Sequence, residues 1–388
     1  MKNKILFFQF SFLPGYKAGG SLRTLANLVD HLGAEFDLRI VCTDRDSGDD
    51  QPYPGIKIGE WQTVGPSQVM YLSPQNRTLK DFRQIILVTK PDLVYLNSFF
   101  HPVFSRQPLI LRRLGSIPKI PFIIAPRGEF SAGAIGLKSL KKHLYIYLAR
   151  LWGLVDGVAW HASNEQEAAD IRALFGAQSK VLIALDLPTK SLVLKSSQRQ
   201  KKPGSLKIVF LARIDRKKNL SGALEMLNGL RGEVRFNIYG PIGDNGYWQD
   251  CQKIIKSLPA NIEAHYCGEI EHNKVIDVLK EHDLFFVPTL GENFGYVYLE
   301  ALSAGCPILL SDQTPWQNLE EKGVGWALPL SQKRIFQEVL QQCVDMGKEE
   351  HALWSKRANL YGLAFMQDKG ALEKNRSMFD RVLLGMTK

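Results

Sequence analysis

Short apolar segments recur along this chain, and they constrain its fold more than any other feature. In the first half they are ILFFQF, LRIVCT, LVYLN, FIIAP and VAWHA, and in the second half LKIVFLA, VRFNIYG, IEAHYCG, LFFVPT and PILLS. Strands of a parallel sheet are buried on both faces, so they read as nearly continuous apolar runs with helices between them. The pattern predicts an α/β fold of two doubly wound, Rossmann-like domains with an interdomain cleft and ligands at the carboxyl ends of the strands.

A polar segment between the two halves indicates the domain boundary. Residues Leu194 to Ser205, LKSSQRQKKPGS, are basic and poor in apolar side chains, which is typical of a linker. We therefore expect an N-terminal domain over residues 1–193 and a C-terminal domain over residues 206–360. The tail, residues 361–388, reads as a helix.

Charge and cysteine content narrow the class of protein. A net charge of +10 indicates an anionic partner, and nucleic acid, anionic lipid and phosphate-bearing substrates all remain open. The five cysteines have no C-x-x-C spacing and fit reduced thiols rather than disulfides or a zinc site. No apolar run approaches the ~20 residues that span a bilayer. The apolar start leads into a glycine loop, which predicts a first strand rather than a signal peptide.

The run from Gly291 to Asp312, GENFGYVYLEALSAGCPILLSD, carries the strongest functional signal. Glu292 stands in a glycine-rich loop behind an apolar run, and Glu300 stands eight positions later in a predicted helix. A strand, a glycine loop that opens a helix and a second strand form a βαβ unit whose helix N-terminus can hold an anion. Because Glu300 can also reach a polyol such as ribose, the run predicts a nucleotide-sugar site.

Two further loops could hold a diphosphate. In LARIDRKKNL, Arg213 follows a strand and Lys218 begins a helix, so the two cations can neutralise a pyrophosphate; a solvated basic turn is the alternative. Gly15, Gly19 and Gly20 follow the first strand, and glycine lets a ligand approach the backbone closely. The spacing is not G-x-G-x-x-G, so an ordinary turn remains open.

Strand ends in the first half carry polar residues suited to an acceptor. Asn97 ends one strand, and His101 follows it and could bond a sugar hydroxyl or transfer a proton. Arg127 ends another strand and suits an anionic group, with a buried ion pair to Glu129 as the alternative. His161 is predicted to be a packed interior residue.

Two other segments have competing interpretations. Asp44 and Asp46 form a D-x-D pattern that could hold a metal ion with a diphosphate, but the polar run DRDSGDD predicts an exposed loop, so we expect no metal site. Lys138 to Trp152 mixes basic residues with Leu, Tyr and Trp. That composition suits either a helix on an anionic membrane surface or an ordinary amphipathic helix.

With these residues in view, the chain resembles the family-4 retaining glycosyltransferases, also called glycosyltransferase group 1, which have the GT-B fold. The resemblance covers nearly the whole chain and is strongest from Ile208 to Trp316. It is carried by Glu292 and Glu300 as the E-x7-E signature, Arg213 and Lys218 as the phosphate-binding pair, and Gly19 and Gly20 as the N-terminal glycine loop.

The resemblance implies a role for each part of the site. Glu300 would bind the ribose hydroxyls, and Glu292 with the backbone of Asn293, Phe294 and Gly295 would hold the donor sugar and phosphate. The segment from Cys267 to Ile270, which includes Gly268 and Ile270, would line the base pocket. The acceptor would bind in the N-terminal domain, the C-terminal helix would pack back on that domain, and no metal ion or other cofactor would be needed.

Two positions depart from the pattern of the family. Many members have a His where this chain has Asn97, so either Asn97 replaces it or His101 supplies the imidazole. Where the family often has P-N-G near the end of the first domain, this chain has ALDLPT, from Ala184 to Thr189, and no site residue is assigned there.

The resemblance implies a retaining, hexosyl-type transferase that moves a sugar from a nucleoside diphosphate to an acceptor hydroxyl. Because no carboxylate stands out as a covalent nucleophile, we expect a front-face reaction in which the departing phosphate helps take the acceptor proton. The acceptor would be a glycan or lipid-linked glycan of cell-surface polysaccharide synthesis. We expect a cytoplasmic location, with a peripheral place on the inner face of the cell membrane also open, and no nucleic-acid partner.

Two alternative functions remain. One is another enzyme on the same fold, either a sugar-nucleotide epimerase or a phosphorylase that would need a pyridoxal-binding lysine. The other is a binding protein: a non-catalytic glycosyltransferase-like subunit or a nucleic-acid binder. The set of Glu, Arg and Lys residues argues against a non-catalytic subunit. The lack of a motif that reads bases argues against a nucleic-acid binder.

Overall fold

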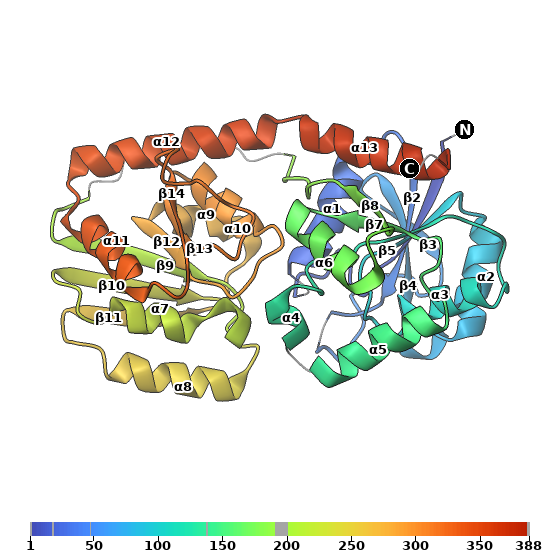
Figure 1. Ribbon diagram of the computed structural model, residues 1–388, viewed down its shortest axis with the longest axis horizontal. Helices are drawn as coiled ribbons and strands as arrows, with labels where there is room; N and C mark the ends of the chain where they lie inside the picture. Colours follow the sequence, from blue (N-terminus) through green and yellow to red (C-terminus); the bar gives the residue numbers. More distant parts are fainter. Residues whose placement is uncertain (1, 18, 47, 137–138, 191–200, 386–388) are drawn as a thin grey trace. The chain divides into compact units, whose positions relative to one another are not determined.

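The computed structural model describes residues 2–17, 19–46, 48–136, 139–190 and 201–385 (Figure 1). The chain forms two compact units: the N-terminal unit, Met1–Lys190 with Asp368–Lys388, and the C-terminal unit, Ser191–Gln367. Most of the predicted linker, residues 194–200, lies outside the described residues.

The N-terminal unit is built on an eight-stranded sheet with the order β3-β4-β2-β1-β5-β6-β7-β8, in which only β3 and β4 are antiparallel neighbours. Its strands are β1 (Lys4–Phe8), β2 (Asp37–Thr43), β3 (Trp61–Val64), β4 (Ser67–Leu72), β5 (Leu93–Leu96), β6 (Phe122–Ile124), β7 (Ala159–Ala162) and β8 (Lys180–Ile183). Its helices are α1 (Gly20–Leu32), α2 (Leu79–Thr89), α3 (Arg106–Arg113), α4 (Ala132–Gly136), α5 (Ser139–Leu151), α6 (Glu165–Phe175) and α13 (Gly370–Leu383).

Helices on both faces of this sheet explain the apolar runs in the sequence. Ile5 and Phe7 of β1 pack into one core cluster with α1 and α13, whereas Leu6 and Phe8 pack into another with α2, α3, α5 and α6. Strands β5, β6 and β7 are buried at every position. Since both sides of each strand meet apolar side chains, alternation with polar residues is absent from these strands.

The C-terminal unit has a six-stranded, all-parallel sheet with the order β11-β10-β9-β12-β13-β14. Its strands are β9 (Ser205–Leu211), β10 (Glu233–Tyr239), β11 (Ile262–Gly268), β12 (Leu284–Val287), β13 (Ile308–Ser311) and β14 (Gly325–Leu328). Its helices are α7 (Leu220–Leu227), α8 (Asn245–Lys256), α9 (His272–Lys280), α10 (Tyr296–Ser303), α11 (Lys333–Asp345) and α12 (Lys348–Gln367). The predicted class, α/β with two doubly wound domains, is confirmed, and β3 is the antiparallel exception.

Each sheet contains a point where the strand order reverses. The chain continues from β1 to β2 on one side and returns to β5 on the other, and it does the same from β9 to β10 and back to β12. The loops that follow the two central strands diverge at such a point and leave room for a ligand at the carboxyl edge. The loops after β1 and β5 and the loops after β9 and β12 are therefore the places where sites can form.

The tail of the chain is divided between the two units. Residues 361–367 complete α12, which packs along α10 so closely that a Cβ at Gly362 would lie 2.6 Å from the Ser303 amide nitrogen. Helix α13 instead joins the core of the N-terminal unit. There Asn375 donates to the Leu185 carbonyl at 2.8 Å, and Arg376 bonds both carboxylate oxygens of Glu35.

Replacing Phe379 by Ala should destabilise the N-terminal unit by about 3–5 kcal/mol, because it empties a fully buried aromatic position. The Phe379 ring lies 5.5 Å from Phe36 and 6.0 Å from Tyr95, centroid to centroid. Urea unfolding followed by circular dichroism measures the loss. Leu384→Ala, at an exposed position of the same tail, is the control and should change stability by less than about 0.5 kcal/mol. Equal stability of the two variants would contradict a core role for α13.

Candidate functional site

The carboxyl edge of the C-terminal sheet brings two charged side chains together. Lys218, in the turn after β9, forms an ion pair with Glu292, in the loop after β12. The Lys218 amide donates to the Asp215 carboxylate at 3.1 Å, and the Asn219 side chain donates to the Pro288 carbonyl at 2.9 Å. Asn219 has a φ of 57°, a left-handed conformation that Asn tolerates. This turn ties the β9 loop to the end of β12 and directs Lys218 toward Glu292.

Several donors surround the Glu292 carboxylate. Oε2 accepts from Lys218 and from the Tyr298 hydroxyl at 3.3 Å, and Oε1 accepts from the Asn293 amide at 3.1 Å. Burial alone would raise the pKa of Glu292, but the charge and hydrogen bond of Lys218, with Lys217 and the Asn293 amide, hold it below its ordinary value. Burial and the Glu292 charge raise the pKa of Tyr298, so its hydroxyl stays protonated and donates. The carboxylate is therefore ionised and held in one orientation.

Gly295 shapes the start of α10 beside this carboxylate. Its φ is 78°, in the region that favours glycine, and a Cβ there would collide with the Tyr298 ring and lie 3.1 Å from Glu292 Cγ. Among the described residues, no side chain caps the N-terminus of α10. An uncapped N-terminus carries amide donors and the positive end of the helix dipole, which together suit a phosphate group.

The buried side chain of Phe294 anchors the loop that carries Glu292. This side chain packs among Tyr296, Trp316 and Phe365, at centroid distances of 4.7, 5.8 and 6.1 Å, and Trp316 Nε1 donates to the Phe294 carbonyl. The predicted binding role of Phe294 can therefore come only from its backbone amide. Through Phe365, α12 supports the loop that carries Glu292.

The other residues predicted to bind the nucleotide sugar lie on several elements of the C-terminal unit. Arg213 follows β9 and is exposed, whereas Glu300 is buried on α10. Gly268 ends β11 with a φ of 83°, and Ile270 follows it, partly buried. Because β11 is the edge strand, two places from β9, Gly268 and Ile270 belong to a separate part of the carboxyl edge.

In the N-terminal unit, Asp46 braces the predicted glycine loop. Its Oδ2 accepts the amides of Tyr16 and Lys17 at 2.7 and 2.9 Å. Gly19, with a φ of 67°, ends the loop, and Gly20 begins α1. A Cβ on either glycine would meet nothing within 4 Å, so the backbone has open space beside it.

The environment of the D-x-D pattern differs from the prediction. Asp44 is fully buried and bonded to two arginine guanidinium groups, and Asp46 is almost completely buried. The expected exposed loop is therefore wrong for these two carboxylates. Both are occupied by donors of this chain, and among the described residues no group of three or more acidic, His or Cys side chains is arranged to hold a metal ion.

Asn97 and Arg127 meet in a buried polar network at the strand ends of the N-terminal sheet. Arg127 forms an ion pair with Asp186, donates from Nε to Asn97 Oδ1 at 2.8 Å, and donates from Nη2 to the Tyr95 hydroxyl at 2.7 Å. Asn97 donates in turn to the Gln9 side chain at 2.6 Å. Arg127 has a φ of 55°, an uncommon conformation for this residue type, which the surrounding contacts over-determine.

His161 extends this network into the core, and its predicted interior position is confirmed. The Tyr95 hydroxyl accepts from Arg127 and so donates to His161 Nδ1 at 2.6 Å, which leaves Nε2 to donate to the Ala184 carbonyl at 2.8 Å. Burial and the Arg127 charge lower the pKa of His161 to about 3. The imidazole is neutral, and its role is to orient the network.

His101 is held by its own loop. Nδ1 accepts the amides of Val103 and Phe104 at 3.2 and 3.0 Å, and the ring lies 5.0 Å from Phe10, centroid to centroid. Burial and two nearby arginines lower the pKa of His101 to about 4. The ring is therefore neutral at neutral pH. It carries its proton on Nε2 and can donate a hydrogen bond to a hydroxyl.

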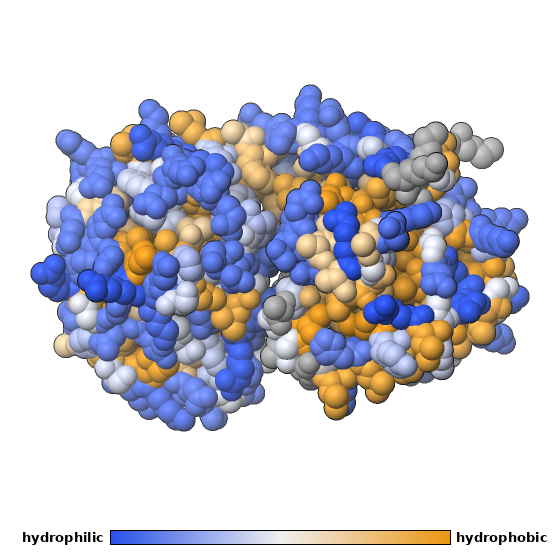
Figure 2. Space-filling view, viewed as in Figure 1, coloured by the Kyte–Doolittle hydropathy of each residue, from blue (hydrophilic) through white to orange (hydrophobic). Residues whose placement is uncertain are grey.

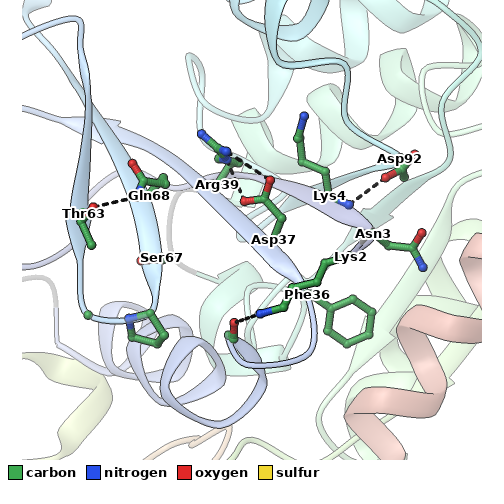
Figure 3. Close-up of a pocket in the computed structure, with 13 residues that line it drawn as sticks. Lys2, Asn3, Lys4, Phe36, Asp37, Arg39, Thr63, Ser67, Gln68 and Asp92 are labelled. Carbon is green, nitrogen blue, oxygen red and sulfur yellow. Dashed lines mark hydrogen bonds and ion pairs between the residues drawn. The ribbon is translucent and has the colours of Figure 1, made fainter.

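A large cavity lies at the opposite edge of the N-terminal sheet, where β1, β2 and β4 begin (Figure 3). Its volume is about 960 Å³. The ammonium groups of Lys2 and Lys4 in its lining donate to backbone carbonyls of the chain. Arg39 bonds Asp37 twice, and Asp92 accepts the Lys4 amide at 2.7 Å. Ligands of such sheets bind at the carboxyl edge, so this cavity is not assigned to the site.

Sequence reasoning missed two residues that hold these sites. Asp186, in the segment ALDLPT, follows β8, so the strand-end rule that selected Asn97 and Arg127 could have found it. Tyr298 carried no signal, because only the left-handed turn at Gly295 brings it back to Glu292, six residues earlier.

Comparison with known proteins identifies the family that part of the chain matches. Residues 194–359 match the family model of glycosyl transferases group 1. A 41.2 kDa protein in the cps region of Klebsiella pneumoniae is 23% identical over 307 residues, which cover 76% of this chain and 78% of that protein. Sulfoquinovosyl transferase SQD2 of Arabidopsis thaliana is 28% identical over 87 residues, 22% of this chain but only 16% of its own length.

Solved structures share the fold over the full chain. Sucrose-phosphate synthase (tll1590) from Thermosynechococcus elongatus matches with a TM-score of 0.74 and 11% identity, over 99% of this chain and 100% of that chain. Anabaena Alr3699/HepE, in complex with UDP and glucose, matches with a TM-score of 0.69 and 14% identity, over 98% and 99% of the two chains. At such low identity the likeness establishes the fold, which is GT-B.

Replacing Gly295 by Ala should destabilise the C-terminal unit by about 1–3 kcal/mol, because the new Cβ meets the Tyr298 ring and the backbone stays left-handed. Thermal unfolding measured by calorimetry reports the loss. Gly246→Ala is the matched control, since Gly246 lies in the first turn of α8 and a Cβ there comes no closer than 3.5 Å to Asp244. An equal effect of both substitutions would contradict the packing of Tyr298 against Gly295.

Proposed function

We propose that this group 1 glycosyltransferase transfers a sugar from a nucleoside diphosphate to an acceptor hydroxyl, with retention of configuration and without a metal ion. The observation that carries the proposal is the Lys218–Glu292 ion pair beside the uncapped N-terminus of α10. These groups lie where the strand order of a parallel sheet reverses. The cation and the helix amides can bind the phosphates of a nucleoside diphosphate sugar, and the fixed carboxylate can accept hydrogen bonds from its sugar hydroxyls.

Each residue of the donor site has a proposed role. Lys218 and the exposed Arg213 neutralise the diphosphate, and the amides at the start of α10 bind its oxygens. Glu292 accepts hydrogen bonds from the sugar, and Glu300 accepts them from the ribose. Gly268 and Ile270 line the base pocket. The UDP and glucose of the Anabaena structure support a nucleotide sugar as donor.

The environment of Glu292 favours a front-face reaction. Its carboxylate is occupied by Lys218, Tyr298 and Asn293, so it is held as an acceptor of hydrogen bonds rather than presented as a nucleophile. The bond from the anomeric carbon to the diphosphate breaks, the acceptor oxygen bonds to the same face, and its proton passes to the departing phosphate. Lys218 and Arg213 stabilise the charge that develops on the diphosphate, which is the work a metal ion would otherwise do.

The acceptor is proposed to bind the carboxyl edge of the N-terminal unit. The loop with Gly19 and Gly20 has open space beside its backbone, and the network of Asn97 and Arg127 holds polar groups in fixed positions. His101 Nε2 is the candidate donor to an acceptor hydroxyl. We propose a glycan or lipid-linked glycan of cell-surface polysaccharide synthesis as acceptor, with the enzyme at the inner face of the cell membrane. The net charge of +10 supports an anionic surface.

A donor screen tests this function. Thermal stabilisation and hydrolysis are measured with a panel of nucleotide sugars, and NMR identifies the anomeric configuration of the first product sugar. We expect stabilisation by one nucleotide class, retention, and turnover unchanged by a chelator. Inversion, loss of turnover with the chelator, or no binding to any nucleotide sugar would each refute the corresponding part of the proposal.

Two substitutions should separate binding from turnover. Glu300→Ala should weaken nucleotide binding roughly 10- to 100-fold, because a charged hydrogen-bond acceptor is lost. Lys218→Ala should lower kcat roughly 100- to 1,000-fold, because the departing diphosphate loses a cation. Calorimetric titration and steady-state kinetics measure the two effects. Lys253→Ala, at an exposed position of α8, is the control. Unchanged kinetics in both variants would overturn the site.

A further inference from the structure

Helix α5 presents apolar side chains to solvent. The stripe consists of Leu140, Leu144, Tyr147, Leu148 and Leu151, which are exposed by 85, 57, 63, 36 and 65%. Their spacing, i, i+4, i+7, i+8 and i+11, places them on one face of the helix. Single exposed apolar residues are ordinary, but a continuous stripe of large ones marks a binding surface.

The opposite face of α5 is already packed, so the stripe is not a misplaced core. Ile146 and Ala149 are buried in the N-terminal core, and the Tyr145 ring lies 5.1 Å from Phe99. Lys142 also points inward, where Nζ donates to the Ala134 carbonyl at 2.5 Å. The helix therefore has two apolar faces, one packed on this unit and one left for a partner.

Cations flank the exposed stripe. Lys141 and Arg150 are exposed beside it, and residues 139–152 contain no acidic side chain. Trp152, exposed by 60%, extends the stripe, and its carbonyl accepts from Arg113 of α3, next to the exposed Leu114. Figure 2 shows apolar residues gathered at the lower edge of the N-terminal unit, where Figure 1 places α5.

We propose that the exposed stripe of α5 docks on an anionic lipid bilayer, with the helix lying in the plane of the membrane surface. An apolar stripe with aromatic residues and flanking cations is the composition of such interfacial helices. At 1.5 Å per residue, a 13-residue helix is about 20 Å long, too short to cross a bilayer. No helix in the described ranges is long and apolar enough to do so.

The packed face of α5 contacts the proposed acceptor loop, so the part of this inference that concerns the acceptor rests on the proposed function. Tyr145 of α5 lies 5.9 Å from Phe100, centroid to centroid, and Lys142 Nζ lies 5.4 Å from the same ring. Phe100 belongs to the loop that starts at Asn97, after β5. A bilayer on the outer face of α5 would bring a lipid-linked acceptor to the unit that holds this loop.

Flotation with vesicles tests the docking surface directly. The full chain is mixed with vesicles of phosphatidylcholine alone or with about one third phosphatidylglycerol. We expect binding to the anionic vesicles only, reduced by high salt. Leu144→Ser with Leu151→Ser, and separately Lys141→Glu with Arg150→Glu, should each reduce binding by about ten-fold or more. Lys142 is left unchanged because it packs inward.

Matched controls remove the general effects of charge and hydrophobicity. Lys80→Glu with Lys119→Glu makes the same charge change at exposed positions outside α5, and Val88→Ser with Leu353→Ser removes exposed apolar residues elsewhere. The controls should float like the natural chain. Circular dichroism and melting temperature confirm that each variant is folded.

Three outcomes would overturn the proposal: no binding of the natural chain, equal binding of the α5 variants and their controls, or a dimer in light scattering that Leu144→Ser with Leu151→Ser converts to a monomer. The last would make the stripe an interface between copies. Flotation requires no donor or transfer, so a chain that floats but binds no nucleotide sugar would refute the proposed function and leave the docking surface standing.

Discussion

The ion pair between Lys218 and Glu292 is the contact on which the rest of the candidate site depends. It joins loops 74 residues apart in the sequence, and it can form because β9 and β12 are adjacent in the sheet. Two partly buried charges gain little unless further hydrogen bonds satisfy them. Tyr298 and the Asn293 amide supply these bonds, and Gly295 permits the turn that brings Tyr298 into reach.

The N-terminal unit holds its strand ends together with a different arrangement. Arg127 follows β6, and its guanidinium group bonds Tyr95 and Asn97 at the end of β5 and Asp186 after β8. One side chain therefore holds the ends of β5, β6 and β8 together. Burial raises the pKa of Asp186 although Arg127 opposes it, and the neutral His161 terminates the network at a backbone carbonyl. Such a surface is preorganised, because its polar groups are positioned before any ligand binds.

The local pattern of apolar and polar residues predicted much of the fold. It failed where a side chain can face either the solvent or the interior. The apolar strands were identifiable because both of their faces are buried, and the strand-end rule found Asn97, Arg127 and Arg213. The polar run DRDSGDD wrongly placed Asp44 and Asp46 in an exposed loop, because consecutive polar residues look solvated whether or not arginines and backbone amides fold over them. Likewise, sequence could not show that Lys141 points outward while Lys142 points inward.

The sequence by itself determined the two parallel sheets, the places where their loops carry charge, and the E-x7-E run, since these follow from periodicity and spacing along the chain. The tertiary structure decided which charges meet: Lys218 with Glu292, Arg127 with Asp186, and Asp46 with the glycine loop. It also decided that one apolar face of α5 is packed while the other faces solvent. Partners far apart in sequence leave no periodic signal, because their contact depends on strand order and on which face of a helix the core occupies.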